Sequence, residues 1–316
     1  MPTIAPPRLE SFRSKTTWFA LFIIGCSTLF LGPLRELFHL SLSSDTYSHI
    51  LATPLISIWL IYLERETIFR EATRTGKSAA YFLGIAAILR IFTWQFGKSI
   101  SGEGSLALAI VGFLFLVWSG FSWVCGDCAF RAGVFPLLFL LLMIPLPVSA
   151  VDRIILWLQW GSGDVTSWIF HATRTPVIRH GLSFTLPSVT IEIAKECSGI
   201  RSAIALVISC LAAGYLLLRS PWTRVILTLA TVPVLVLKNG LRIATLTLLA
   251  IHVDPGFLDG HLHQQGGFVF FAAGLTMLLP VLWCLQKLER KRSGSRPPDQ
   301  RNTKFTGEDL PQRIAT

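Results

Sequence analysis

Residues 105–124 read Ser-Leu-Ala-Leu-Ala-Ile-Val-Gly-Phe-Leu-Phe-Leu-Val-Trp-Ser-Gly-Phe-Ser-Trp-Val, an unbroken stretch of 20 residues without a charged side chain. An α-helix rises about 1.5 Å per residue, so about 20 apolar residues cross the roughly 30 Å hydrocarbon core of a bilayer. The stretch therefore predicts a membrane-spanning helix.

The composition of the whole chain agrees with this prediction. Hydrophobic residues make up 52% of the 316 residues and charged residues only 15%, whereas about a quarter of a soluble domain is charged. The net charge of +10 does not indicate a nucleic-acid partner. The basic residues stand in short clusters between apolar runs, which is typical of the cytoplasmic loops of membrane proteins.

Seven further stretches approach or reach the length of a span, at residues 17–31, 48–63, 78–95, 132–149, 198–218, 225–250 and 267–286. The span at 132–149 contains Pro136, Pro145 and Pro147, and we expect it to be kinked or broken there. The predicted fold class is an all-α polytopic membrane protein of about eight transmembrane helices. We expect its transmembrane domain to cover residues 17–290.

Lys and Arg residues in short loops mark the cytoplasmic side. With eight spans and both termini inside, five basic groups fall on one side, represented by Arg13, Arg70, Arg131, Arg219 and Lys291. Residues 1–16 are then a cytoplasmic N-terminus and residues 291–316 a disordered basic cytoplasmic tail. A small extracytoplasmic segment, 150–197, separates helices five and six. Within it, 152–173 predicts an interfacial or re-entrant helix, and 181–186 and 189–193 predict short strands.

A cysteine stands where this outer segment enters the sixth span, in Glu192-Ile-Ala-Lys-Glu-Cys197-Ser-Gly-Ile-Arg201. The positive end of a helix dipole favours an anion, so we expect the thiol pKa of Cys197 to fall. Arg201 follows four residues later on the same helical face and can add positive potential. A small packed cysteine at a tight helix start is the structural alternative.

An arginine at membrane depth stands in Asn239-Gly-Leu-Arg242, inside an apolar run. Such a charge is costly in lipid and indicates a functional site. Asn239 and Arg242 share a helical face. The alternatives are an arginine paired with a carboxylate such as Asp254 or Glu192, or one that snorkels outward.

Two histidines precede the last span, in Asp259-Gly-His261-Leu-His263-Gln-Gln-Gly-Gly267. Imidazole transfers protons near neutral pH; an interfacial polar loop is the alternative. The predicted topology brings Cys197, Arg242 and the histidines to the outer face. This set suits thiol-based acyl transfer, which needs a nucleophile, a cation for the oxyanion and a proton carrier. Cys125-Gly-Asp-Cys128 lacks a second cysteine pair, so we expect neither a metal nor another cofactor.

Together these segments resemble the exosortase/archaeosortase family, with its Cys-Ser-Gly-x-Arg motif, its Asn-x-x-Arg motif and a His before a Gly-rich start of the last helix. The resemblance spans roughly residues 80–285. It implies a cysteine transpeptidase of the cell (inner) membrane, with its active site on the extracytoplasmic side. Its partners would be the lipid bilayer, exported proteins whose C-terminal signal combines a motif, a helix and a basic cluster, and an unidentified acceptor nucleophile.

The resemblance also implies roles for single residues. Cys197 is the nucleophile, Arg242 stabilises the oxyanion or the thiolate, and His263 moves the proton. Supporting or substrate-binding residues are Ser198, Arg201, Asn239 and His261, and His261 can replace His263 as the proton carrier. A transporter or exopolysaccharide-export component with an intramembrane Arg/His pathway is the main alternative, and a membrane acyltransferase with a lipid substrate is another.

Overall fold

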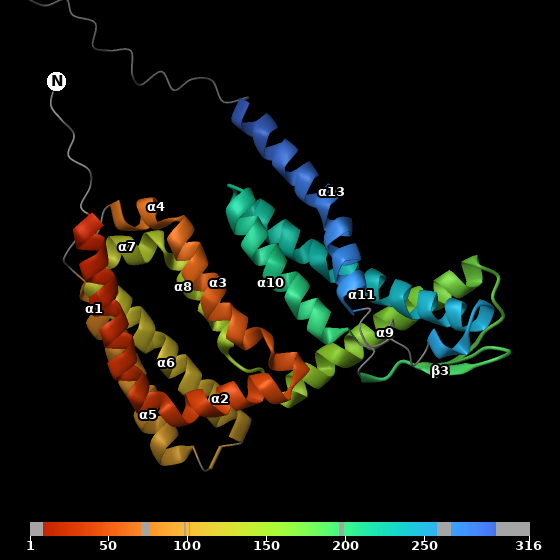
Figure 1. Ribbon diagram of the computed structural model, residues 1–316, viewed down its shortest axis with the longest axis horizontal. Coiled ribbons are helices and arrows are strands. Elements are labelled where there is room, and N and C mark those ends of the chain that lie inside the picture. Colours follow the sequence, from red (N-terminus) through yellow and green to blue (C-terminus); the bar gives the residue numbers. More distant parts are fainter. Residues whose placement is uncertain are drawn as a thin grey trace, which may run out of the picture.

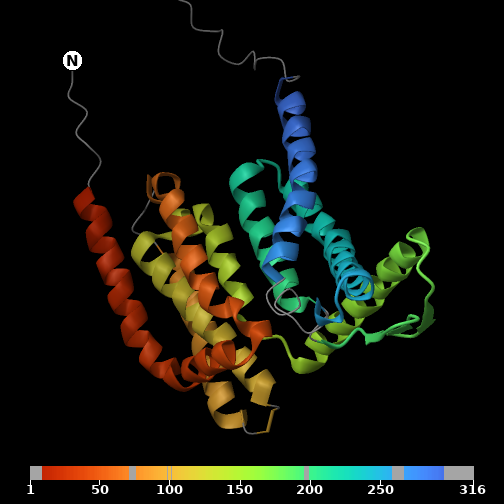
Figure 2. The same ribbon diagram turned by 45° about the vertical axis from the view of Figure 1, so that its right-hand side comes forward.

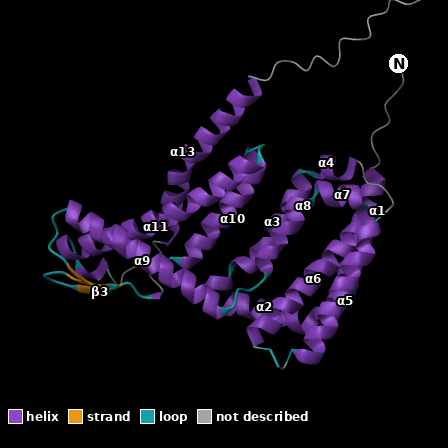
Figure 3. Ribbon diagram, turned by 180° about the vertical axis from the view of Figure 1, so that it is seen from behind, coloured by secondary structure: helices purple, strands orange, loops and turns teal. Residues whose placement is uncertain are grey.

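The computed structural model describes residues 9–70, 76–97, 99–100, 102–195, 199–257 and 267–294. Its helices dominate the fold (Figure 3). The first group comprises α1 (Leu9–Ser27), η1 (Thr28–Phe30), α2 (Leu31–Ser43), η2 (Asp45–Tyr47), α3 (His49–Leu63), α4 (Arg65–Arg70), α5 (Lys77–Phe96), α6 (Gly102–Cys125), α7 (Asp127–Ala132), α8 (Val134–Phe139) and η3 (Leu140–Met143). The second comprises α9 (Val148–Ala172), α10 (Ile200–Leu217), α11 (Pro221–His252), η5 (Pro255–Phe257) and α13 (Gly267–Gly294).

Within the described ranges, seven helices are long and apolar enough to cross a membrane, or eight if a bent helix pair is counted as one span. The predicted all-α polytopic class is therefore confirmed. The opening stretch, 105–124, lies in α6, whose most apolar window is more buried than that of any other candidate span. It packs against α1, α2 and α5 through a core that includes Phe30, Ile110 and Leu114.

The outer surface of the bundle is strongly apolar. Large hydrophobic side chains stand exposed on most candidate spans, among them Tyr81, Trp94, Trp222 and Phe268, each more than 70% exposed. A water-soluble protein rarely exposes so much contiguous apolar surface, whereas lipid chains cover it at no cost. These exposed side chains are the physical reason for assigning the chain to a membrane.

Two parts of the molecule lie side by side in Figure 1: α1–α8 at one side, and α10, α11 and α13 at the other. A small apolar cluster joins them, in which Leu60 of α3 and Phe139 of α8 meet Ile208 of α10. α9 begins beside the first part and runs outward beneath the second (Figures 1 and 2). The core of the second part includes Leu158, Leu206, Leu235 and Leu278, from α9, α10, α11 and α13.

The break predicted at the prolines of the fifth span is confirmed. The helical stretch Val134–Met143 and α9 meet at an angle of 94° across the segment that holds Pro145 and Pro147. Proline lacks the N–H that a helix needs and clashes with the preceding turn, so the helix ends there and restarts in a new direction. The predicted helix at 152–173 is the body of α9.

A three-stranded antiparallel sheet follows α9, in the order β1 (Ile178–His180), β2 (Ser183–Thr185) and β3 (Thr190–Glu192). Two of its strands were expected from the sequence, and β1 was not. The first predicted span was too short, because helical structure continues from α1 through η1 and α2 to Ser43. α2 turns sharply away from α1 (Figure 1).

The elements that carry the basic groups gather at one end of the bundle. α4, α7, the turn between α10 and α11 and the far end of α13 lie at the same end in Figures 1 and 2. The sheet and the first turn of α10 lie toward the opposite end. Most of the predicted tail, 295–316, lies outside the described residues.

Candidate active site

The structure describes part of the predicted site. Arg201, Asn239 and Arg242 lie within the described ranges, whereas Cys197 and Ser198 and the histidines His261 and His263 lie outside them. The described part of the predicted site therefore consists of the residues that flank Cys197 and of the helix that carries Asn239 and Arg242.

The chain that leads toward Cys197 is anchored to α9. Gln159 is buried, and its Nε2 donates a hydrogen bond of 2.6 Å to the carbonyl oxygen of Ile193. The backbone N–H of Ile193 donates to the carbonyl oxygen of Leu182 at 3.0 Å. Two residues later, Lys195 forms an ion pair of 2.9 Å with Asp152. These contacts fix the approach to the cysteine against both the sheet and α9.

The chain that follows Cys197 turns at Gly199, whose φ is +68°. L-residues with a Cβ rarely adopt this left-handed conformation. A Cβ at this position would also lie only 2.7 Å from Oδ1 of Asn239. The glycine of the Cys-Ser-Gly segment is thus required twice, by its backbone angle and by the close approach of the Asn239 side chain.

Asn239 is buried where α9 and α11 cross. The side chain is 2% exposed, and its Nδ2 donates a hydrogen bond of 3.0 Å to Oγ of Ser162. The next residue, Gly240, lies against α9, where an added Cβ would be 2.6 Å from Val165. Small residues allow membrane helices to approach closely, and polar side chains then bridge them.

Arg242 lies one helical turn beyond Asn239 on α11 and is half-buried. Arg201, by contrast, is exposed on α10, where its Nη1 forms an ion pair of 3.0 Å with Asp45 of η2. The structure therefore places Arg201 in a bridge between α10 and the first part of the molecule. Its charge is partly offset by this partner.

Lys238, immediately before Asn239, is a polar residue of this region that was not predicted from the sequence. It is 2% exposed, and its ammonium group donates a short hydrogen bond to Oγ of Ser202 on α10. Ser202 in turn donates to the carbonyl oxygen of Gly199 at 3.0 Å. The rule that identified Arg242, a charge inside an apolar run, applies equally to Lys238.

Arg90 of α5 is another cation inside an apolar run, and it has local partners. Its Nε donates a hydrogen bond of 2.9 Å to the carbonyl oxygen of Leu29, and its guanidinium carbon lies 5.6 Å from the centre of the Phe30 ring. Arg90 thus joins α5 to η1, in the first part of the molecule, away from the Gly199–Asn239 contact.

The cysteine pair Cys125 and Cys128 lies at the junction of α6 and α7. Cys125 is buried and Cys128 is exposed. Among the residues that the structure describes, no group of three or more His, Cys, Asp or Glu side chains is arranged to hold a metal ion.

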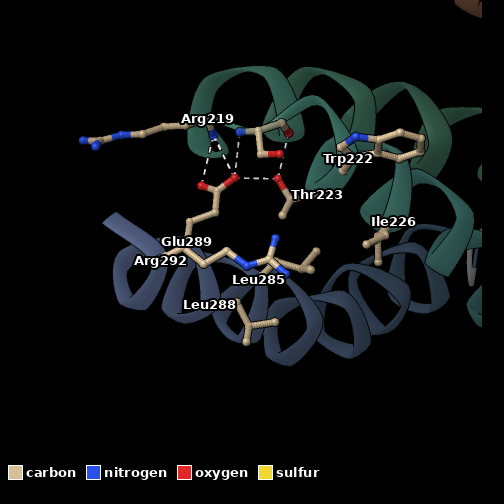
Figure 4. A pocket seen from close by; sticks show the side chains of 9 residues that line it. Arg219, Trp222, Thr223, Ile226, Leu285, Leu288, Glu289 and Arg292 are labelled. Atoms are coloured by element: carbon tan, nitrogen blue, oxygen red, sulfur yellow. Dashed lines mark hydrogen bonds between the residues drawn. The ribbon is translucent and has the colours of Figure 1, made fainter. Parts of the chain in front are cut away.

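A pocket of about 430 Å³ lies elsewhere, between the start of α11 and the end of α13 (Figure 4). There the Glu289 carboxylate accepts hydrogen bonds from the backbone N–H groups of Arg219 (3.0 Å) and Ser220 (2.8 Å) and from the Thr223 hydroxyl (2.5 Å). A carboxylate at a helix N-terminus satisfies unpaired N–H groups and suits the helix dipole. Glu289 therefore fastens α11 to α13, about 27 Å of helix away from Asn239.

The fold defines a polytopic helical membrane protein. Polar and cationic side chains of α9, α10 and α11 contact one another inside it. Residues 41–280, more than half of the chain, match the family model described as transmembrane exosortase, and the chain belongs to this family. The match includes all three predicted site segments. Neither a search of curated proteins nor a search of solved structures gives a match.

Proposed function

We propose that this protein is a membrane-embedded cysteine transpeptidase that cleaves C-terminal sorting signals of exported proteins and transfers them to a cell-surface acceptor. Membership in the transmembrane exosortase family supports a membrane transpeptidase in general. The thioester mechanism, the substrates and the residue roles are parts of the proposal.

One observation carries the proposal furthest: two segments about forty residues apart in sequence meet in space. Gly199, from the Cys-Ser-Gly-x-Arg segment, lies against the Asn239 side chain of the Asn-x-x-Arg segment. Cys197 precedes Gly199 by two residues, and each trans peptide advances the chain by only about 3.8 Å. The length of the intervening chain therefore limits how far Cys197 can be from α11, which supports the proposal of a shared site.

The proposed reaction uses this juxtaposition. The Cys197 thiolate attacks the scissile carbonyl carbon, and the guanidinium of Arg242 stabilises the negative charge that develops on the carbonyl oxygen. His263 delivers a proton to the leaving amine, which departs with the helical part of the signal. The acceptor nucleophile then attacks the thioester and gives its proton to His263, the bond between the acyl carbon and the sulfur breaks, and the thiolate is restored.

We place the site on the extracytoplasmic side of the inner membrane. The elements that carry the basic clusters lie at one end of the bundle, and the segment around Gly199 lies toward the other. In a variant without the native cysteines, a cysteine at position 195 should react with a membrane-impermeant maleimide in cells whose outer membrane alone is permeable. Labelling only after the inner membrane is opened would contradict this orientation.

The decisive test of the function is Cys197→Ala, assayed with a reporter that ends in a motif, an apolar helix and a basic cluster. We expect complete loss of processing with normal accumulation of the protein in the membrane. Arg242→Lys should also fail severely, because lysine keeps the charge but loses the planar fork that can hold two oxygens. Cys284→Ala, at an exposed position of α13, is the matched control and should process normally.

Full processing by Cys197→Ala would overturn the nucleophile and with it the transpeptidase. The buried Lys238 and the half-buried Arg242 would then favour the transporter or export component, because charges that line a pathway are the other common use of intramembrane cations. A lipid rather than a peptide thioester on Cys197, identified by mass spectrometry, would instead indicate an acyltransferase.

A further inference from the structure

Lys238 is enclosed by protein on every side. Its side chain is 2% exposed in the middle of α11. It passes under α13, where a Cβ on Gly274 would lie 3.2 Å from Cδ of Lys238. Among the residues that the structure describes, no carboxylate oxygen lies within the 4.0 Å limit of an ion pair with its ammonium group.

Burying an ammonium group is expensive, because the group loses its hydration. A structural role in this bundle would be filled at lower cost by Leu or Met, since apolar side chains surround the stem. Leu206 and Leu278 belong to the same core. The retained charge therefore indicates a role that needs the charge itself.

The hydrogen bonds of Lys238 lead toward the predicted nucleophile. Its ammonium donates to Oγ of Ser202, and that hydroxyl donates to the carbonyl oxygen of Gly199. Gly199 is the second residue after Cys197. Two hydrogen bonds thus connect a buried cation to the first turn of the helix that starts just after the thiol.

We propose that Lys238 is a positioning residue for the Cys197 thiolate: through Ser202 it holds the turn that follows the cysteine, and its fixed positive charge favours the ionised thiol. The proposal rests on the proposed function, since it assigns Lys238 to the same site. In this arrangement Lys238 touches neither substrate nor acceptor. It acts on the nucleophile together with the α10 dipole and Arg242.

The size of the effect follows from Coulomb's law. A unit charge that acts over about 10 Å at an effective dielectric of about 20 shifts a pKa by roughly one unit. Removing the charge should therefore shift the pH midpoint of Cys197 ionisation upward by about one unit. Below the midpoint, the rate of thiol alkylation should fall about tenfold.

The test measures the pH dependence of iodoacetamide alkylation of Cys197 in purified full-length protein whose other five cysteines are replaced. Lys238→Met and Lys238→Gln remove the charge, and Gln keeps a donor for Ser202. Both should raise the midpoint by about one pH unit, and Lys238→Arg should restore it. Lys287→Met is the matched control: this lysine lies 4.9 Å from the Trp283 ring near the end of α13, and its loss should leave the midpoint unchanged.

Unchanged midpoints in folded Lys238→Met and Lys238→Gln would overturn the proposal, and so would a Lys238→Arg midpoint as high as that of Lys238→Met. If the Lys238 variants do not accumulate, Ser202→Ala tests the same connection from α10. It should shift the midpoint upward, and no shift would overturn the proposal. Alkylation needs no substrate, so this result stays separate from the Cys197→Ala processing assay that tests the proposed function.

Discussion

Two polar clusters, one in each part of the molecule, are built around charges of opposite sign. The first surrounds the Asp127 carboxylate and the second surrounds the Lys238 ammonium group. Asp127 of α7 accepts hydrogen bonds from the backbone N–H of Lys77 (2.9 Å), from the Ser122 hydroxyl (2.6 Å) and from the Ser78 hydroxyl. Burial alone would raise the pKa of the Asp127 carboxyl, but these bonds outweigh burial and keep its pKa below the ordinary value. The start of α5 supplies hydrogen-bond donors to the carboxylate, so the charge of Asp127 is satisfied within its own cluster.

The cluster around Lys238 is cationic, and a hydrogen-bond partner of Lys238 among the described residues is a neutral hydroxyl. Lys238 donates to a serine hydroxyl, and Arg242 follows one turn later on the same helix. A site that must hold a thiolate and then an oxyanion needs surplus positive charge before the substrate arrives. Asp127, a partly buried charge satisfied at a helix start, therefore joins structural elements, whereas the buried Lys238 lies beside the segment that leads to the proposed nucleophile.

The largest effect expected for the proposed reaction, after loss of the nucleophile, belongs to a histidine. His263→Ala should reduce processing by roughly 10²–10⁴-fold, the usual worth of a positioned acid or base. His261→Ala should reduce it far less. Turnover of the reporter substrate by both variants gives the comparison. The reverse pattern would move the proton carrier to His261 and leave the enzyme class intact.

A smaller but still clear loss is expected from Gly199→Ala. The added methyl group would meet Oδ1 of Asn239 at 2.7 Å on a backbone with φ of +68°. The left-handed conformation alone costs about 1 kcal/mol with a Cβ, and the turn must also move away from Asn239. We expect processing to fall by more than about tenfold, since small misplacements of reacting groups are costly.

Gly84→Ala on α5 is the control for Gly199→Ala, because a Cβ there meets nothing within 4 Å. It should process at the wild-type rate. Equal rates for Gly199→Ala and Gly84→Ala would show that the Gly199–Asn239 contact is unnecessary for the reaction.

Asp127→Asn should distinguish the structural role of the Asp127 cluster from the functional role proposed for the Lys238 cluster. We expect a loss of about 1 kcal/mol of stability, because hydrogen bonds to a charged acceptor are about that much stronger than bonds to a neutral one, with unchanged processing of the reporter. The folded-state pKa of Asp127 is lowered, so its stabilisation is present above the unfolded pKa of about 3.9 and is lost as the pH falls through the folded value. Thermal unfolding in detergent between pH 7 and pH 3 measures both effects.

In that experiment the wild-type protein should lose its advantage over Asp127→Asn as the pH approaches 3. A constant difference between the two proteins over this range would contradict the role assigned to the carboxylate. A strong loss of processing in a stable Asp127→Asn variant would contradict the division between a structural and a functional cluster.

The smallest effect is expected at Arg201. Its ion pair with Asp45 is exposed, with 67% and 80% of the two side chains accessible, and such pairs contribute about 0.2–1 kcal/mol. Arg201→Gln should lower stability by no more than this and should change processing only a few-fold. A double-mutant cycle with Asp45→Asn isolates the pair. A loss of processing above a hundredfold would show that Arg201 takes part in the proposed reaction.

The sequence predicted the class of fold well, because hydropathy and basic loops report directly on the bilayer. It also predicted the break at Pro145 and Pro147, since proline acts locally. The direction of α9 after the 94° bend depends on its packing against α11, and β1 depends on pairing with β2. These are tertiary contacts between segments whose partners a single sequence does not specify.

The candidate site shows the same limit. Cys197, Arg242 and the histidines could be proposed because each is an unusual residue for its place in the chain. The contact between Gly199 and Asn239 joins two helices, and no local pattern predicts it. Lys238 could have been found from the sequence, since it is a charge in an apolar run. Its enclosure by α10 and α13 is visible only in the folded protein.

The length of α11 has a consequence for what surrounds its two ends. Its 32 residues extend for about 48 Å, well beyond what hydrocarbon alone can cover. Past Arg242, α11 buries Ile243 and Ala244 against Phe170 of α9 and Phe184 of β2. The protein thus supplies its own apolar cover where the lipid ends. We infer that α11 passes along its length from a lipid environment into an environment that the protein itself provides.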